Sequence, residues 1–185
     1  MKVKGSVLLA RRAFVERHFG AGAWERVLAA LPAEDRAALR GMVLHVGWFP
    51  FRLGESLDAT IVRVLGDGQA SLFEQIGRTS ARENLAGAHK SFLVPGDPQK
   101  FLAQTGEIYS FYYDTGRRSY QASGPTSGVM TTYDADAFSA PDCLTVIGWH
   151  KEALAQCGAR DVRITEETCR ARGGEYCRYR LEWSP

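Results

Sequence analysis

The sequence predicts an α+β fold in which N-terminal helices pack on a C-terminal antiparallel sheet of about four strands. Apolar residues recur at helical spacing up to about residue 113. After Gly116 the pattern changes to short strand-like segments that are separated by turn residues. One helical segment is inserted among these strands. Helices followed by antiparallel strands are typical of α+β domains.

Glycine and proline divide the helical part into its elements. The expected helices run from Leu8 to Leu31 with a break at Gly20 and Gly22, from Pro32 onward, from Glu55 to Leu65, from Gln69 to Phe92 and from Pro98 to Tyr113. Pro32 suits a first helical turn, and Asp97 suits the N-cap of the last helix. The aromatic segment His45–Phe51 is expected to be irregular, because Pro50 limits any helix there.

The sheet part is expected to contain two pairs of strands on either side of the inserted helix. The expected strands are Arg117–Gly124, Ser127–Tyr133, Arg160–Cys169 and Glu175–Trp183. The inserted helix is expected to start with Asp142 as its N-cap and to end at Cys157, which Gly158 follows.

Composition favours one globular domain over residues 1–185. The chain has 185 residues, 45% of them apolar, and a formal net charge of +2 without a basic stripe, so we expect no nucleic-acid partner. It has no apolar run of the length that a membrane span needs and no secretory signal at its N-terminus. We therefore expect a cytoplasmic location, where thiols stay reduced.

Three cysteines near the C-terminus indicate a metal site. Cys169 and Cys177 lie symmetrically about Gly173, so a hairpin centred there would place their Cβ atoms about 4.5–5.5 Å apart. Cys143 falls in the first turn of the inserted helix, where the helix dipole stabilises a thiolate and lowers its pKa. With a carboxylate, these three thiolates would complete the tetrahedral site that zinc prefers. Cys157 would lie about 21 Å along the helix from Cys143 and is excluded.

The fourth ligand is open between Glu166 and Glu167. In a regular strand Glu167 shares a face with Cys169, so Glu166 would require a bulge before that cysteine. The residues also allow two other interpretations, which are ordinary buried thiols and a cross-strand disulfide between Cys169 and Cys177.

The segment Asp142–Trp183 resembles the 4-vinyl reductase domain, the ligand-sensing module of phenol-responsive activators. That family holds a structural zinc ion with three cysteines and a glutamate. Cys143, Glu166, Cys169 and Cys177 reproduce its spacing of 22, two and seven intervening residues. Ile147-Gly148-Trp149 is also similar to the family's sequence. The resemblance implies structural zinc as the cofactor and favours Glu166 over Glu167.

The opening of the chain, from Lys4 to Leu28, is similar to the start of haem-nitric-oxide-binding domains. The wider superfamily also contains the TRAPP-type subunits that tether vesicles. This resemblance implies an α+β domain, often a homodimer, that encloses an apolar pocket between helices and sheet. It implies a non-catalytic sensor of a small apolar molecule, aromatic or acyl, with the pocket residues unassigned. The alternative is a dimeric adaptor that binds a protein partner.

Two further classes are disfavoured by the residues. The sequence has no phosphate-binding glycine loop, nucleophile elbow or paired zinc-binding histidines, so we expect no enzyme. The haem-binding branch of the superfamily needs an axial histidine and a later Tyr-x-Ser-x-Arg motif. Tyr109 occupies the place of that histidine, Tyr113–Arg117 follows it too closely to be the motif, and His89 is the other helical candidate. Haem is therefore expected to be unlikely.

Overall fold

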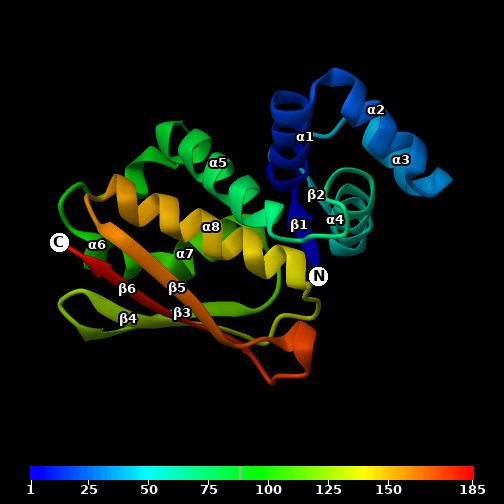
Figure 1. The fold of residues 1–185 in the computed structure, drawn as a ribbon. Coiled ribbons are helices and arrows are strands. Elements are labelled where there is room, and N and C mark those ends of the chain that lie inside the picture. Colours follow the sequence, from blue (N-terminus) through cyan, green and yellow to red (C-terminus); the bar gives the residue numbers. More distant parts are fainter. Residues whose placement is uncertain (88) are drawn as a thin grey trace.

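The chain folds into a group of helices at one end and a helix-covered antiparallel sheet at the other (Figure 1). The structure is a computed structural model, which describes residues 1–87 and 89–185. The helical subdomain consists of β1 (Lys2–Lys4), α1 (Gly5–Phe19), α2 (Ala21–Ala30), α3 (Ala33–Arg40), β2 (Trp48–Pro50) and α4 (Phe51–Leu65). Short strands β1 and β2 pair antiparallel with each other.

The remainder of the chain forms the sheet subdomain and its covering helices. Its helices are α5 (Leu72–Ala86), α6 (Pro98–Leu102), α7 (Thr105–Tyr112) and α8 (Ala140–Gln156), with 3-10 turns at Lys90–Phe92 and Arg170–Arg172. Its strands are β3 (Arg117–Gly124), β4 (Ser127–Tyr133), β5 (Arg160–Thr168) and β6 (Cys177–Ser184). They form one antiparallel sheet in the order β3-β4-β6-β5, which confirms the predicted α+β class.

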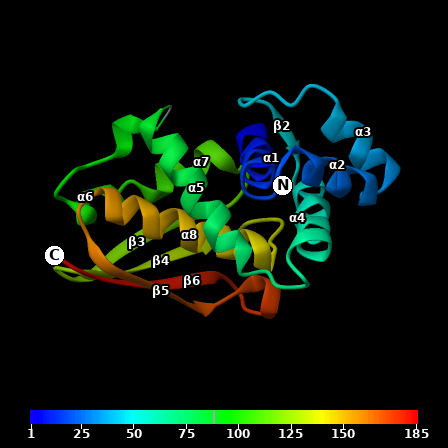
Figure 2. The same cartoon turned by 45° about the horizontal axis from the view of Figure 1, so that its top comes forward.

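Helix α8 is the central layer of the sheet subdomain. It lies between the sheet and α5, as both views show (Figures 1 and 2). The α5–α8 crossing is close because glycines face the opposing backbone: a Cβ on Gly77 would overlap the Thr145 carbonyl oxygen, and one on Gly148 would overlap that of Glu74. This contact fixes α8 against α5 and so sets which of its side chains point at the sheet.

Two apolar cores share α5. One lies among α1, α2 and α4 and takes Phe73 and Ile76 from α5. The other lies among α6, α7, α8 and the sheet and takes Ala81 and Leu85 from the other end of the same helix. The helical subdomain therefore rests on the sheet subdomain through a shared helix.

Several boundaries differ from the sequence predictions. The predicted helix Pro98–Tyr113 is two helices, because the chain turns at Gln104, whose side-chain amide donates to the carbonyls of Phe92 and Lys100. Gly106 then brings α7 close to the backbone of Arg118. The predicted helix Gln69–Phe92 begins at Leu72 and ends at Ala86.

The N-cap of α8 also differs from its prediction. It is Ser139 and not Asp142, because the Ser139 hydroxyl accepts a hydrogen bond from the Asp142 backbone N–H at 3.2 Å. The Asp142 carboxylate instead accepts from the Tyr113 hydroxyl at 2.9 Å. Within the described residues, no helix combines the length and the apolar character needed to cross a membrane.

Replacing Gly148 by alanine should damage the α5–α8 contact. We expect Gly148→Ala to lower the free energy of unfolding by about 2–4 kcal/mol, because the added methyl group meets backbone that cannot move aside. Gly22→Ala in the exposed helix α2 is the control and should raise stability by about 0.5–1 kcal/mol. Urea unfolding measures both, and equal effects of the two substitutions would contradict the contact.

Candidate functional site

A partly open pocket with a cavity volume of about 40 Å³ lies where α1, α5, α7, β3 and α8 meet. Most of its exposed wall is apolar, and its polar atoms come from a few buried side chains. The lining residues are Val7, Arg11, Ser80, Ile108, Tyr112, Tyr113, Arg118, Thr145, Val146, Trp149 and His150. The sequence predicted such a pocket between helices and sheet, and it left these residues unassigned.

His150 lines this pocket and has one ring nitrogen in use. The side chain is 2% exposed, and its Nδ1 donates to the Val146 carbonyl oxygen at 2.9 Å, so Nδ1 carries the proton. Nε2 is buried and has no hydrogen-bond partner among the residues that the structure describes. Burial, and then the positive charge of Arg118, lower the pKa of His150 to about 3. The imidazole is therefore neutral, with a free electron pair on Nε2.

Sequence reasoning missed His150. It lies on the same face of α8 as Val146 and Leu154, both of them apolar, so its burial could have been predicted from helical spacing. Its unpartnered nitrogen could not, because that depends on which elements surround α8. The neighbouring indole Nε1 of Trp149 is also buried without an acceptor.

Arg11 connects the cavity to both subdomains. Its guanidinium donates to the two carboxylate oxygens of Asp58 at 3.1 and 3.2 Å and to the Thr145 hydroxyl at 3.2 Å, and Asp142 lies 3.6 Å away. Burial lowers the pKa of Arg11, but the charge and hydrogen bonds of Asp58 raise it by more. The net result is a pKa above the usual value of arginine. Burial raises the pKa of Asp58 to about 6, although Arg11 opposes this shift. The pair is charged at neutral pH and lies entirely inside the protein.

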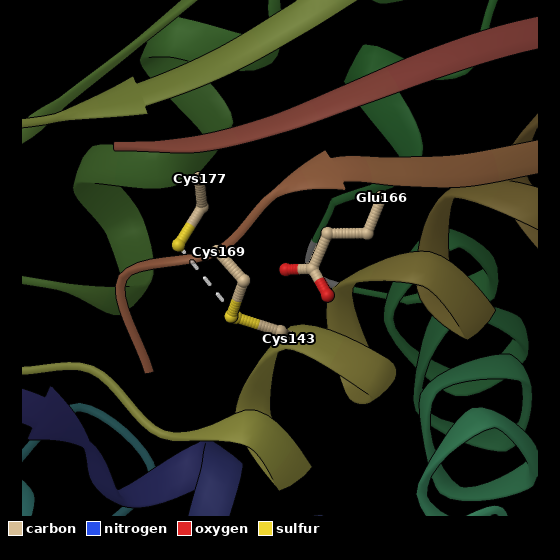
Figure 3. Close-up of side chains that lie close together, drawn as sticks. All are labelled: Cys143, Glu166, Cys169 and Cys177. Carbon is tan, nitrogen blue, oxygen red and sulfur yellow. Dashed lines mark hydrogen bonds between the residues drawn. The ribbon is translucent and has the colours of Figure 1, made fainter. Parts of the chain in front are cut away.

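The four residues predicted as metal ligands come together beside the N-terminal end of α8 (Figure 3). The Cys143 sulfur lies 3.8 Å from the sulfurs of both Cys169 and Cys177, and the four ligand atoms lie within 4.8 Å of one another. A tetrahedral ion with metal–sulfur bonds of about 2.3 Å separates its sulfurs by about 3.8 Å. Cys157, at the other end of α8, is not part of this group.

The bulge that Glu166 requires is present. The pairing of β5 with β6 shifts register between Glu166 and Thr168, so Glu166 turns toward the sulfurs. One of its oxygens pairs with Arg172, and the other is buried without a partner. Glu167 faces away and binds Arg178 and Arg180. Cys169 follows the end of β5 and Cys177 begins β6, and the pairing of Thr168 with Arg178 sets the two cysteines opposite each other, as predicted, where the loop with the 3-10 turn begins.

The thiols share protons in the metal-free cluster. The hydrogen bond from the Cys143 thiol lowers the pKa of Cys177 to about 6, and the backbone N–H of Arg170 also donates to that sulfur. The same hydrogen bond, together with burial, raises the pKa of Cys143. Burial and the neighbouring Cys177 sulfur thus oppose the lowering that the sequence prediction ascribes to the helix dipole, and that prediction for a metal-binding thiolate stays a prediction.

The residues that sequence reasoning tested for haem do not act together. The Tyr109 hydroxyl donates to the Thr115 carbonyl at 2.8 Å, and burial raises its pKa to about 12. Arg117 is exposed and pairs with Asp134. His89 lies between α5 and a 3-10 turn and not within a helix. The predicted mimic of the haem motif is thus split between the interior and the surface.

Comparison with solved structures identifies the fold. An H-NOX protein from S. oneidensis in the Fe(II)NO ligation state superposes with a TM-score of 0.76 at 14% identity, covering 98% of this chain and 99% of that one. The Fe(II) unliganded H-NOX protein from K. algicida gives 0.73 at 11% identity, covering 98% and 97%. The chain has the H-NOX fold. No family model and no curated protein matches its sequence.

These neighbours correct the cofactor prediction. We predicted structural zinc and took haem to be unlikely, and that prediction is wrong. The neighbours' iron is described in named ligation states, and a third neighbour, at a TM-score of 0.67 and 11% identity with 97% and 99% coverage, is described by its haem redox potential and porphyrin distortion. Haem is the cofactor to which the H-NOX fold points. The sequence argument rested on the missing axial histidine at Tyr109 and the missing motif after it, and it could not see the fold that these structures share.

Only one feature of the pocket suits haem. His150 is a lining residue with a neutral imidazole, which is the form that binds metals. Arg118 also lines the pocket, but the charge of Arg11 is already paired with Asp58. The present volume is much smaller than the about 300–1,000 Å³ of common ligand pockets, so a porphyrin would have to part the elements around the cavity.

The Arg11–Asp58 pair is expected to matter for stability mainly when one partner is removed and the other stays buried. Arg11→Met should lower the free energy of unfolding by about 3–5 kcal/mol, because it leaves the buried Asp58 carboxyl without its ion-pair partner. The double substitution Arg11→Met with Asp58→Leu should recover much of that loss. Urea unfolding at pH 7 measures both.

The matched control for this prediction is Arg12→Met. Arg12 is half-exposed and pairs with Glu16 one helical turn away, so its loss should cost no more than about 0.5 kcal/mol. A double variant no more stable than Arg11→Met alone would show that the buried charge is not the cause.

Proposed function

We propose that this chain is a non-catalytic sensor domain that binds a small molecule in the cavity between α1, α5, α7, β3 and α8. The observation that carries this proposal is that His150 lines a largely apolar pocket and that its buried Nε2 has no hydrogen-bond partner among the described residues. A buried nitrogen without a hydrogen bond costs about 1–3 kcal/mol, so a ligand that satisfies it gains that energy on binding.

Haem is the ligand that the fold favours. The neighbours with the same fold bind iron, and one of them is described with bound NO. When bound, an iron porphyrin supplies an open coordination position for a diatomic gas. The protein would supply the aromatic walls of Tyr112 and Trp149, the imidazole of His150 and the charge of Arg118. We propose that ligand arrival is passed on by a change in how the two subdomains pack.

Titration of the purified chain with ferric haem tests this function. We expect saturable binding with one haem per chain, and Val146→Trp should weaken it at least tenfold, because the larger ring fills the cavity. Val46→Trp, at an exposed position, is the matched control and should bind as the unchanged chain does. Absorbance in the Soret region is the measurement. Binding of equal affinity by both variants would place the haem elsewhere.

A second candidate is a sensor of a small aromatic or acyl molecule in the same cavity. The volume of about 40 Å³ favours it, since less rearrangement is needed than for a porphyrin. The resemblance of the C-terminal segment to the 4-vinyl reductase domain supports it as well. Native mass spectrometry of the freshly purified chain would show such a ligand as a non-covalent adduct lost from Val146→Trp.

The adaptor alternative rests on a different surface. Met42, Leu44, Val46 and Trp48 are 83, 54, 78 and 40% exposed along one segment before α4. An apolar stretch of this kind suits a protein contact, either with a second copy or with another partner. Sedimentation of the unchanged chain and of Met42→Ser with Val46→Ser would show whether a homodimer depends on it.

We also propose that Cys143, Glu166, Cys169 and Cys177 bind one thiophilic metal ion. The sulfur spacing and the unpartnered oxygen of Glu166 support this. A site with four protein ligands is closed and structural. The ion would tie the last hairpin to the first turns of α8. We also propose that residues 1–185 form a single domain, since α5 contributes to both apolar cores.

Cys169→Ser should lower the metal content and the melting temperature together, because it removes one ligand from the cluster. Cys157→Ser is the control, since Cys157 is buried on the same helix but outside the cluster, and it should keep the metal. Elemental analysis and thermal unfolding are the measurements. Glu166→Gln should lose metal and Glu167→Gln should not, and the reverse result would reassign the fourth ligand.

A further inference from the structure

The exposed apolar segment between α3 and β2 restricts what it can bind through its backbone contacts. This apolar loop, residues 41–47, runs on the outside of the helical subdomain (Figure 2). Its side chains Met42, Leu44 and Val46 are 83, 54 and 78% exposed. Single exposed apolar side chains are common in proteins, whereas three at alternate positions of one short segment indicate a contact surface.

The backbone of the apolar loop is hydrogen-bonded within the protein. Four consecutive carbonyl oxygens, those of residues 44–47, each accept a hydrogen bond. Their donors are, in order, the N–H groups of Gly47 and Ser6, the Lys4 ammonium and the N–H of Gly5, at 3.0, 3.1, 3.1 and 2.9 Å. A loop whose carbonyl oxygens are already bonded can enter an apolar medium without leaving them unsatisfied.

The outer face of the β1–β2 pair continues this surface. In the register of the two strands, Lys2 lies opposite Pro50 and Lys4 lies opposite Trp48. Side chains alternate along a strand, so these four share one face, whereas Val3 is buried on the other. The Lys4 ammonium lies 3.7 Å from the centre of the Trp48 ring, and it also binds the apolar loop.

Both segments that form this surface are basic. The sequence has no aspartate or glutamate in residues 1–10 or in residues 36–54. Their basic residues are Lys2, Lys4, Arg36, Arg40, His45 and Arg52. Arg40 and Arg52 form ion pairs with acids of α2 and α3, whereas Lys2, Lys4 and Arg36 form none with the residues that the structure describes. The surface is therefore complementary in charge to an anionic one.

We propose that the apolar loop and the outer face of β1–β2 bind an anionic lipid surface. The apolar side chains of the loop enter the boundary between headgroups and acyl chains, Trp48 lies at the level of the headgroups, and Lys2 and Lys4 face lipid phosphates. This peripheral contact needs no membrane-spanning helix. It goes beyond the proposed sensor function and is independent of the ligand in the pocket.

A lipid surface suits these residues better than a protein partner does. Protein interfaces carry hydrogen bonds across the contact, at about one bond per 100–200 Å². In the apolar loop the carbonyl oxygens of residues 44–47 already accept bonds, and the one polar side chain is that of His45. Acyl chains require no hydrogen bonds from the groups that enter them.

Co-sedimentation of the purified full chain with lipid vesicles tests the proposed contact. Vesicles that contain phosphatidylglycerol should bind the chain at least tenfold more tightly than vesicles of phosphatidylcholine alone, and added salt should weaken this binding. Met42→Ser with Val46→Ser should lower the affinity at least tenfold, and Lys2→Gln with Lys4→Gln should remove the preference for anionic vesicles. Phe19→Ser, at an apolar position that is 43% exposed elsewhere, is the matched control and should bind as the unchanged chain does.

Tryptophan fluorescence gives a second measurement that needs no change in the loop. Trp48 is 40% exposed, whereas Trp24, Trp149 and Trp183 are 4, 6 and 7% exposed. Lipids that carry bromine on the acyl chain near the headgroup should therefore quench the emission of Trp48 in the bound chain. Trp48→Phe should lose this quenching.

Three results would overturn the lipid contact. These are no binding to either kind of vesicle, binding that Met42→Ser with Val46→Ser leaves unchanged, and a bound chain whose Trp48 is not quenched. If the chain binds no vesicles and the same two substitutions abolish a dimer in sedimentation without lipid, the surface serves a protein contact instead. Each variant should melt at the temperature of the unchanged chain, and if one melts earlier, the quenching of Trp48 in the unchanged chain decides.

Discussion

The backbone contact between α5 and α8 is the constraint on which the other features depend. Gly77 and Gly148 let the two helices approach without side chains between them. With α5 so close, one side of α8 must face the sheet and another the junction with α1 and α7. Cys143 is thereby set beside the closing strands, and His150 is set at the junction. If α5 and α8 crossed at a larger distance, neither the cysteine cluster nor the lining of the pocket would come together.

The fold class and the cysteine cluster could be predicted from sequence because both depend on short-range patterns. Strands β3 and β4 occur at their predicted bounds, since alternation and a turn define them locally. Glu166 lies beside the cysteines because of a bulge that choosing it required, although spacing alone left Glu166 and Glu167 open. The β1–β2 pair could not be predicted, because three-residue strands carry almost no periodic signal and their pairing joins segments that are distant in sequence.

The residues that sequence reasoning missed were missed for one common reason. His150 and Arg11 look ordinary in sequence, and their roles depend on what the fold leaves around them. Arg11 finds Asp58 and Thr145 on two other helices, and the second of these is far along the chain. The error about haem has the same origin. The search considered Tyr109 and His89, which precede β3, whereas His150 lies on α8 and lines the pocket.

The buried ion pair also bears on how the parts of the fold are joined. Arg11 and Asp58 both belong to the helical subdomain, whereas Thr145 belongs to α8. Separating α1 from α8 would break the hydrogen bond to Thr145 and the 3.6 Å contact with Asp142, and would keep the Arg11–Asp58 pair. It would also have to draw Phe73 and Ile76 of α5 out of the core among α1, α2 and α4, or carry α5 with it. The buried pair therefore holds the helical subdomain together, whereas the shared core of α5 joins that subdomain to the sheet.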